Sequence, residues 1–270
     1  MPAVPIHGNY YGYYLKRPFT ADPRLALLSD DLFAGRRVLD VGCNEGWVTC
    51  EIAQSWGASH VLGVDIDEVL IRGSWRRRRV AWSLQAPDSH PSHLASDSEE
   101  RPSKRAREET PIVPNHFPAS FEHTYGPVSV PPYENTRKHL FPHNVSFRTA
   151  DWVNEDVPED QSGYDVVIAF SISKWIHLNG GDDAMVRFFK RVHDVLSVGG
   201  VFVLETQPWD TYAKARKMDK RLQENAKNLT LRPNDFERLL KEIGFGSPRN
   251  LGTTGEGQFC RPVDVYTKIW

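Results

Sequence analysis

Residues 38–49 read Val38-Leu39-Asp40-Val41-Gly42-Cys43-Asn44-Glu45-Gly46-Trp47-Val48-Thr49. A short apolar run with β propensity leads into two glycines, and a helical pattern follows from Trp47. A strand, a glycine turn and a helix in this order are typical of the cofactor-binding loop of a Rossmann-like sheet. We expect Gly42 to allow a sharp turn after the strand, and Gly46 to allow a ligand and the helix to approach closely.

The spacing of these glycines separates two classes of cofactor. A dinucleotide fingerprint has the pattern G-x-G-x-x-G, whereas here Gly42 is followed by Gly46 and preceded by Asp40 inside the strand. A cofactor without a pyrophosphate needs no phosphate cradle at this turn. The pattern D-x-G-x-x-x-G resembles motif I of the class I S-adenosylmethionine (SAM) methyltransferases, so SAM is the predicted cofactor.

A second acid lies at the end of the next predicted strand. Residues 61–67 read Val61-Leu62-Gly63-Val64-Asp65-Ile66-Asp67. An acid at the tip of the second strand accepts hydrogen bonds from both ribose hydroxyls of such a cofactor. We therefore expect Asp65 to bind the ribose and Asp67 to cap the helix that follows.

The composition narrows the class of protein. The chain has 270 residues, of which 40% are hydrophobic, and we expect one methyltransferase domain across residues 1–270. The net charge of −2 predicts that any polyanion site is a local patch. Cys43, Cys50 and Cys260 form no C-x-x-C pair, which argues against a disulfide framework or a zinc site. Without a signal peptide or a membrane-spanning run, we expect a soluble, intracellular, metal-free monomer.

Residues 1–20 are rich in glycine and tyrosine, with Gly8-Asn9-Tyr10-Tyr11-Gly12-Tyr13-Tyr14 followed by Lys16 and Arg17. The segment is either a packed N-terminal arm or a lid, with aromatic faces and two cations for a phosphorylated, base-bearing ligand. Asp22-Pro23 then has the N-cap and N1 signature of a helix to about Phe33. Arg24 on that helix faces either the cofactor's carboxylate or solvent.

Residues 84–140 are rich in Pro, Ser, His and charge, and no periodicity is present. We expect a disordered insertion or a long surface loop there. Within it, the basic cluster at 102–107 is either a nuclear-localisation signal or a solvated loop. Before this insertion, Arg76-Arg77-Arg78-Arg79 is expected to end the helix that follows Asp65. The alternative is that these arginines contact RNA phosphates.

Strands and helices alternate through the rest of the chain. Predicted strands lie at 144–152, 164–170, 201–205 and 263–269, and predicted helices at 182–196 and 233–243, with Gly199-Gly200 as the stop of the first helix. The fold class is therefore α/β: a Rossmann-like, seven-stranded, mostly parallel sheet with an antiparallel last strand and helices on both faces. Asp151, at the tip of strand 144–152, is expected near the adenine, with Trp152 beside it.

The substrate-side residues of such enzymes follow the fourth strand, where this chain reads Ser171-Ile172-Ser173-Lys174-Trp175-Ile176-His177-Leu178-Asn179. The [DNS]-P-P-[YFW] motif of many DNA and protein amide methyltransferases is absent from this position. A cation, an indole, an imidazole and an amide suit an anionic oxygen acceptor instead. Simpler explanations remain for each: Lys174 as a surface charge, Trp175 as core packing, and His177 as a structural residue rather than a general base.

The chain resembles the RNA methylphosphate capping enzymes in five blocks. They are Gly8-Asn9-Tyr10 with Tyr13-Tyr14, 39–44, 171–179, Glu205-Thr206-Gln207-Pro208-Trp209, and Arg261-Pro262-Val263. The resemblance implies a SAM-dependent enzyme that methylates the 5′ γ-phosphate of a small RNA polymerase III transcript, such as 7SK RNA or a spliceosomal small nuclear RNA. A sister branch methylates RNA 5′-monophosphates and usually lacks the lysine before the tryptophan. Lys174 therefore favours the capping branch.

The resemblance also implies which residues bind each ligand. With the motif residues Asp40 and Gly46, the predicted cofactor site comprises Tyr14, Arg24, Gly42, Cys43, Asn44, Asp65, Ile66, Asp151, Trp152 and Phe170. The predicted RNA site comprises Tyr13, Lys174, Trp175 and Arg261, with Tyr10, Lys16, Arg17, Asn179, Gln207 and Trp209 around them. The chain departs from the family at Asp151-Trp152, where Asn-Tyr is frequent, at Thr206, where proline is frequent, and in a shorter arm before Arg24.

A terminal phosphate oxygen is already anionic near neutral pH, because its second pKa is about 6. We expect it to attack the sulfonium methyl group without a strong base, so that catalysis depends on positioning and electrostatics. Lys174, Arg261 and the Tyr13 hydroxyl would hold phosphates, and Trp175 or Tyr10 would stack on the first base. Two alternatives stay open: a SAM enzyme for another anionic acceptor, and an RNA-binding subunit that stabilises a small ribonucleoprotein with partner proteins.

Overall fold

The computed structural model describes residues 4–14, 21–85, 124–133, 138–255 and 260–270. The predictions for Lys16, Arg17, the basic cluster at 102–107 and most of the insertion at 84–140 lie outside these residues. Within the described ranges, no helix is both long enough and apolar enough to cross a membrane.

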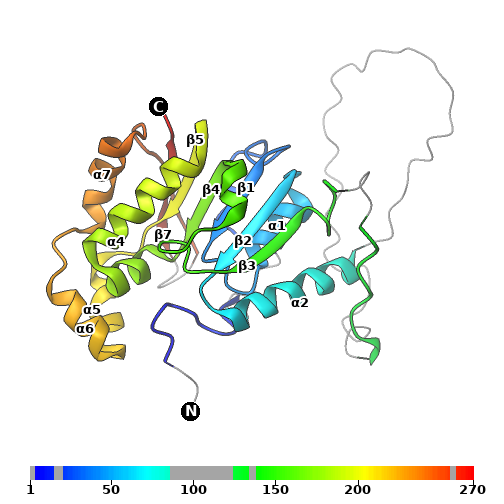
Figure 1. The fold of residues 1–270 in the computed structure, drawn as a ribbon, viewed down its shortest axis with the longest axis horizontal. Coiled ribbons are helices and arrows are strands. Elements are labelled where there is room, and N and C mark those ends of the chain that lie inside the picture. Colours follow the sequence, from blue (N-terminus) through cyan, green and yellow to red (C-terminus); the bar gives the residue numbers. More distant parts are fainter. Residues whose placement is uncertain (1–3, 15–20, 86–123, 134–137, 256–259) are drawn as a thin grey trace.

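A seven-stranded sheet forms the centre of the molecule, in the order β3-β2-β1-β4-β5-β7-β6 (Figure 1). Its strands are β1 Arg37–Val41, β2 His60–Asp65, β3 Val145–Thr149, β4 Tyr164–Phe170, β5 Leu196–Glu205, β6 Arg249–Thr254 and β7 Arg261–Thr267. The first five strands pair in parallel, and β7 runs antiparallel to both of its neighbours, β5 and β6. This arrangement confirms the predicted fold class, and β6 adds an edge strand for which no range was predicted.

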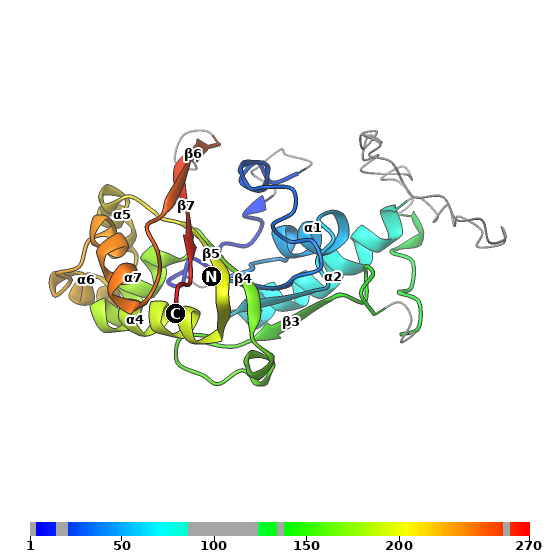
Figure 2. The same ribbon diagram turned by 90° about the horizontal axis from the view of Figure 1, so that it is seen from above.

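Helices cover both faces of the sheet (Figure 2). The helices of the described residues are α1 Trp47–Ser55, α2 Glu68–Leu84, α4 Ser173–Val195, α5 Tyr212–Ala215, α6 Lys220–Lys227 and α7 Phe236–Ile243. One apolar core packs α1 and α2 against the sheet through residues such as Ile52 and Ile71. The other packs α4 and α7 on the opposite face through residues such as Phe188 and Leu240. The apolar alternation of the strands places side chains in both cores.

The strand order reverses beside β1, which pairs with β2 on one side and with β4 on the other. In open α/β sheets, this reversal leaves a crevice at the carboxyl ends of the strands. The motif turn at 42–46 follows β1, Asp65 ends β2, and Ser171 follows β4. The fold therefore brings all three to the same edge of the sheet.

Three predicted element boundaries were wrong. The helix expected from Asp22 is only a 3₁₀ turn, η2 Leu25–Leu27, because the Asp22 carboxylate binds the Arg24 side chain as well as its backbone N–H. The helix with the arginine run does not end there but continues to Leu84. Gly199-Gly200 lies inside β5, since the preceding helix ends at Val195.

The segment after β4 also differs from expectation. The helix predicted from residue 182 starts already at Ser173, and Gly181, with φ 72° and ψ −172°, interrupts it between the two parts of α4. The substrate-side residues 173–179 therefore lie in the first part of α4. Helical spacing places Lys174 and Leu178 four residues apart on one face, so successive residues of the block point in different directions.

Candidate functional site

A cavity of about 570 Å³ opens at the carboxyl ends of β1, β2, β3 and β4. Its walls come from the strand ends, the first turns of α4 and the N-terminal segment 7–14. The described part of the predicted lid thus contributes directly to the cavity. Among the described residues, no cluster of His, Cys, Asp or Glu could hold a metal ion.

The glycine turn forms one end of the cavity. Gly42 has φ 77° and Asn44 has φ 52°, a left-handed conformation that asparagine tolerates better than most residues. A Cβ atom at Gly42 would lie 2.2 Å from Ile172 Cγ2, so the turn packs directly against the start of α4. Gly46 does not line the cavity; a Cβ there would collide with Phe147 and Ser74, so its close neighbours are β3 and α2 rather than a ligand.

Asp65 lies in the cavity at the end of β2 and is 9% exposed. Its Oδ2 accepts a hydrogen bond from the backbone N–H of Asn44 at 2.9 Å, and its Oδ1 accepts one from the N–H of Asp67 at 3.0 Å. These two bonds fix the carboxylate while each oxygen keeps a further lone pair for a ligand. Burial raises the pKa of Asp65 to about 6. Ile66 beside it is 39% exposed and lines the cavity.

Asn44 carries an unpaired acceptor at the same end. Its Nδ2 donates to the Tyr10 carbonyl at 3.3 Å, but its Oδ1 is buried and has no hydrogen-bond partner among the described residues. A buried amide oxygen without a partner costs free energy that a ligand donor would recover. Phe170, Asp151 and Trp152 complete this end of the cavity.

Two other predicted cofactor residues, Asp40 and Cys43, support the glycine turn at 42–46 from the protein interior. Asp40 accepts a hydrogen bond from Thr49 Oγ1 at 2.6 Å, and burial raises its pKa to about 7. Cys43 is 3% exposed and packs in the core with α1. Neither side chain lines the cavity. Trp152, which does, also donates its Nε1–H to Asp160 at 3.1 Å, which fixes its ring.

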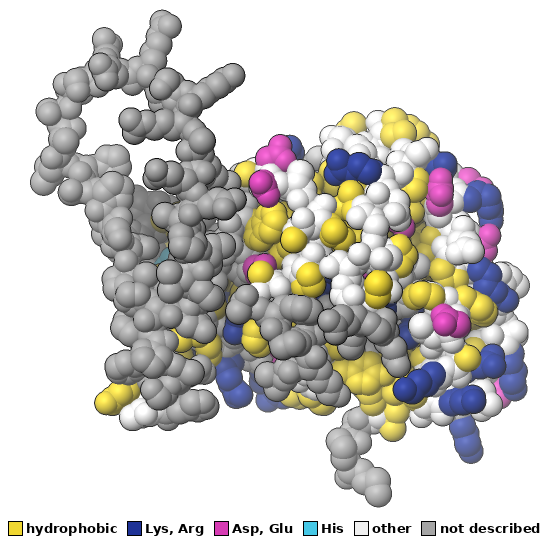
Figure 3. Space-filling model, turned by 180° about the vertical axis from the view of Figure 1, so that it is seen from behind, with side chains coloured by type: hydrophobic (Ala, Val, Ile, Leu, Met, Phe, Trp, Pro, Cys, Tyr) yellow, Lys and Arg dark blue, Asp and Glu magenta, His cyan; other side chains and the backbone are white. Residues whose placement is uncertain are grey.

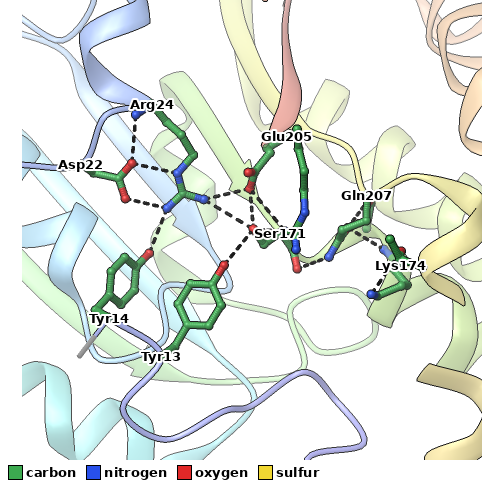
Figure 4. A network of polar contacts seen from close by, with 11 residues as sticks. Tyr13, Tyr14, Asp22, Arg24, Ser171, Lys174, Glu205 and Gln207 are labelled. Atoms are coloured by element: carbon green, nitrogen blue, oxygen red, sulfur yellow. Dashed lines mark hydrogen bonds and ion pairs between the residues drawn. The ribbon is translucent and has the colours of Figure 1, made fainter. Parts of the chain in front are cut away.

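A buried polar network lies behind the middle of the cavity (Figure 4). All five N–H groups of Arg24 are occupied, by Asp22, Glu205, Ser171 and Tyr14. Arg24 is 2% exposed and does not line the cavity, whereas Tyr14, which accepts its hydrogen bond, does. Internal partners therefore bind the Arg24 guanidinium rather than solvent, and its contact with a cofactor carboxylate stays a prediction.

Ser171 connects this network to the opposite end of the cavity. It follows β4 with φ 63°, and its hydroxyl donates to Glu205 and accepts from Arg261 Nη1 at 2.7 Å. Tyr13 hydrogen-bonds the same hydroxyl at 3.3 Å. Gln207 donates to the Ser171 carbonyl and accepts from the Lys174 N–H. One serine therefore positions residues predicted at the cofactor and residues predicted at the RNA.

Cations gather at the second end of the cavity. Lys174, on the first turn of α4, and Arg261, at the start of β7, were predicted there. Lys214 of α5 and Arg221 of α6 also line the cavity, and the sequence pattern did not single them out. Figure 1 places α5 and α6 at the lower left, and in Figure 3, turned by 180° about the vertical axis, Lys and Arg side chains gather at the corresponding lower right. The cavity thus has an acidic end and a basic end.

Lys174 and Arg261 are the most buried of these four cations, and Lys174 is the buried lysine. It is 8% exposed, and its Nζ donates to Thr211 Oγ1 at 3.3 Å and lies 5.1 Å from the Trp175 ring centroid. Burial and the nearby Arg261 lower its pKa to about 8. The ammonium has no carboxylate within ion-pair distance among the described residues, which makes it available to an anion.

The N-terminal segment crosses the cavity between the two ends. Asn9 Nδ2 and the Tyr11 hydroxyl donate to Asp67 Oδ2 at 2.7 and 2.9 Å, on the acidic side. On the basic side, Asn179 Nδ2 donates to the Ile6 carbonyl at 2.8 Å. Asp67 also caps α2 through Oδ1, as predicted, and its contact with the segment is the part that local sequence did not reveal.

Aromatic rings line the same segment. Tyr10 meets the Trp175 ring edge-on at 5.9 Å. A Cβ atom at Gly8 would lie 2.3 Å from Trp175 Cδ1, so only glycine fits over the indole. Trp175 is 8% exposed, so it both packs in a small core and lines the cavity.

Two further predicted residues, His177 and Trp209, do not line the cavity. His177 is fully buried; its ring nitrogens hydrogen-bond Asp182 Oδ1 at 2.7 Å and the Tyr212 hydroxyl at 3.2 Å. Burial lowers its pKa, and this placement agrees with the structural alternative rather than with a general base. The Trp209 ring centroid lies 4.6 Å from that of Tyr212 and 3.9 Å from the Arg232 guanidinium, so this ring has a structural role too.

Comparison with known proteins identifies the family. The family model described as Bicoid-interacting protein 3 (Bin3) matches residues 164–268. The human 7SK snRNA methylphosphate capping enzyme is 37% identical over 277 residues, which cover 97% of this chain and 39% of that protein. A probable RNA methyltransferase of Arabidopsis thaliana is 31% identical over 265 residues, 96% of this chain and 79% of that protein. The chain belongs to the Bin3 family.

A solved structure supports the fold of this Bin3-family chain. A chain from the complex of the Haloferax volcanii Trm112 methyltransferase activator with a methyltransferase superposes with a TM-score of 0.51 at 11% identity, covering 95% of this chain and 92% of that one. At this identity the likeness concerns the fold alone. The chain spans less than half the length of the human capping enzyme, so the activity of the whole protein is a matter for proposal.

Proposed function

We propose that this Bin3-family chain is a SAM-dependent methyltransferase that adds a methyl group to the 5′ γ-phosphate of a small RNA polymerase III transcript, a 7SK-like or spliceosomal small nuclear RNA. The observation that carries the proposal is the cavity itself. An acid suited to a ribose and four cations suited to phosphates occupy opposite ends of one space of about 570 Å³. Similarity to a capping enzyme over 97% of the chain supports the same substrate class.

The residues at the acidic end fit SAM. Asp65 would accept from the ribose hydroxyls, and the unpaired Asn44 Oδ1 would accept a further donor. Phe170 and Ile66 supply apolar walls, and Asp151 lies at the end where the adenine is expected. SAM bound there supplies a reactive methyl group. The chain's own contribution is to bind and orient it, and Arg24 would do so through Tyr14.

The residues at the basic end fit a 5′-triphosphate. Lys174, Arg261, Lys214 and Arg221 would bind phosphate oxygens, and the Tyr13 hydroxyl could donate another hydrogen bond. Gly8 leaves room for Trp175 and Tyr10 to approach each other, and an RNA base would stack beside these rings. A γ-phosphate oxygen is anionic near neutral pH, so no side chain has to remove a proton. The burial of His177 is consistent with that chemistry.

We extend the proposal to the oligomeric state, the cellular compartment and the partners of the protein. A single methyltransferase domain would act as a monomer in the nucleus, where small nuclear RNAs are processed, with ribonucleoprotein proteins as partners. The one continuous sheet supports the single domain, and the naming of the human relative for a small nuclear RNA supports the compartment. Light scattering in solution and imaging of the tagged full chain test the two statements.

The proposal is tested by methyl transfer from labelled SAM to one short hairpin RNA with a 5′-triphosphate, 5′-monophosphate or 5′-hydroxyl end. Label on the triphosphate RNA alone is expected. Preference for the monophosphate would assign the chain to the sister activity. Label on the hydroxyl form would point to another acceptor, and tight RNA binding without label on any form would point to a stabilising subunit.

A further inference from the structure

The exposed face of α2 has no role in the cavity. The helix carries five arginines and a single acid, Glu68. Charges of this sign stabilise a helix when they lie in its last turn, through the helix dipole. Because α2 continues to Leu84, none of the arginines lies in that turn, and the dipole does not account for them.

The arginines divide into two groups. Arg77 and Arg78 are half-buried and pack over indole rings, Arg77 at 3.6 Å from Trp47 and Arg78 at 4.5 Å from Trp75. Their positions are explained by packing. Arg72, Arg76 and Arg79 are exposed instead. The spacing of four and three residues places these three side chains along one face of the helix.

The exposed arginines lack strong partners. Arg72 approaches Glu68 at 3.8 Å, with both side chains about two-thirds exposed or more, and such a pair contributes little. No acid of the described residues forms an ion pair with Arg76 or Arg79. Trp75, 36% exposed, lies among them on the same helix. Guanidinium groups beside an exposed indole are typical of a surface that binds the backbone of a nucleic acid.

This face begins at the rim of the cavity. Asp67, the N-cap of α2, accepts the hydrogen bonds of Asn9 and Tyr11 from the segment that crosses the cavity. Figure 1 shows α2 starting beside that segment and running away from α5 and α6. Twelve residues separate Asp67 from Arg79, which is about 18 Å at ~1.5 Å per residue. That length corresponds to roughly five nucleotide steps of ~3.4 Å.

We propose that Arg72, Arg76 and Arg79 form a second RNA-binding surface, which holds backbone phosphates of the RNA several nucleotides away from the 5′ end bound in the cavity. The inference rests on the proposed function, because the RNA in the cavity supplies these phosphates. The surface raises affinity for long RNA without specifying sequence, since phosphate contacts carry no sequence information. It makes no contribution to the chemistry at the 5′ end.

The test compares a 5′-triphosphorylated hairpin with a triphosphorylated trinucleotide. Binding is measured by fluorescence anisotropy over a series of salt concentrations. Arg72→Gln/Arg76→Gln/Arg79→Gln is expected to weaken hairpin binding at least tenfold and to reduce the slope of log K against log[salt] by about 2–3, since each of the three phosphate contacts contributes roughly 0.7–0.9. Binding and methylation of the trinucleotide should be unchanged.

The matched control removes three charges from the opposite face of the sheet. Lys190→Gln/Arg238→Gln/Lys241→Gln changes exposed residues of α4 and α7 and should leave both RNAs unaffected. The Arg→Lys triple variant keeps the charge of α2 and should restore most of the hairpin affinity, which separates lost charge from a folding defect.

An unchanged salt slope in the glutamine variant, or an equal loss in the control, would overturn the proposal. Intact RNA binding with lost binding to vesicles of anionic lipid would also overturn it and assign the face to a membrane surface. Failure of the proposed function looks different: the wild type would then methylate neither RNA, whatever the salt slope of the hairpin.

Discussion

The side chain of Asn9 donates a hydrogen bond of 2.7 Å to Asp67, which also caps α2 next to the carboxylate of Asp65. The contact joins the N-terminal segment to the strand end that is proposed to bind the cofactor. Asn179 joins the same segment to α4 at the other end of the cavity. The position of the segment therefore depends on both halves of the site.

The N-terminal segment should loosen when its bonds to Asp67 are removed. Asn9→Ala/Tyr11→Phe deletes both donors to Oδ2 and leaves the helix cap on Oδ1 intact. Hydrogen bonds to a charged group contribute about 1.5–3 kcal/mol each, so we expect RNA affinity to fall by at least tenfold. Equilibrium binding of triphosphorylated RNA measures the loss. A double-mutant cycle between Asn9→Ala and Asp67→Ala should give a coupling of about 1 kcal/mol or more, and additive effects would contradict the contact.

Cofactor affinity should depend on the ionisation of Asp65. Its pKa of about 6 means that the free protein gains a proton there as pH falls, and a neutral carboxyl accepts ribose hydroxyls poorly. SAM affinity is therefore expected to be constant above pH 7 and to fall about tenfold per pH unit below 6. Calorimetric titrations from pH 5 to 8 check this.

In Asp65→Asn the pH dependence should vanish and SAM affinity should be at least tenfold weaker at every pH. Asp183→Asn, an exposed acid on α4, should behave like the wild type. A variant at Asp65 that kept both the affinity and the pH profile would remove this residue from the cofactor site.

Loss of the Lys174 ammonium should impair methyl transfer and spare SAM. Lys174 lies at the basic end of the cavity, so Lys174→Ala is expected to lower kcat/KM for triphosphorylated RNA roughly 100-fold or more, with SAM affinity within about twofold. Lys190→Ala, an exposed lysine farther along the same helix, is the control. Equal losses of transfer and of SAM affinity would refute the assignment.

Ionisation of Lys174 should also limit activity at high pH. Its pKa of about 8 implies that the free protein loses this charge as pH rises, so kcat/KM should fall above pH 8. At low pH, kcat/KM should rise as the terminal phosphate of the RNA ionises, with a pKa of about 6. Lys174→Arg stays protonated throughout, and the decline above pH 8 should disappear in that variant even if its absolute activity is lower.

His177 should matter for stability and not for the reaction. It is fully buried between Asp182 and Tyr212. His177→Ala is expected to lower the free energy of unfolding by about 2–4 kcal/mol, through lost hydrogen bonds and a cavity. Urea unfolding measures this, and the activity per folded molecule at low temperature should stay within about threefold. A 100-fold loss in a fully folded sample would restore His177 as a catalytic residue.

Local sequence was sufficient where a function depends on neighbours in the chain. The turn at 42–46 and the acid that ends β2 follow from a strand, a glycine and a helix in succession, and Gly42, Asn44 and Asp65 line the cavity. The alternation of strands and helices likewise predicted the sheet. The boundaries at Asp22 and Gly199 were wrong because a carboxylate and two glycines were each assigned to helix ends. The Asp22 carboxylate instead binds the nearby Arg24 side chain, and the two glycines lie in β5, where they pair with Lys268.

What the sequence determined by itself, then, is the fold class, the glycine turn and the position of Asp65, because strand and helix periodicity and turn chemistry are local. Only the tertiary structure decided that Lys214 and Arg221 line the cavity together with Lys174, and that Asp67 binds the N-terminal segment. The same holds for His177 and Arg24, whose polar atoms bind internal partners. These outcomes depend on how helices far apart in the chain pack across the sheet edge. Burial and pairing there determine which of many similar side chains stay available to a ligand.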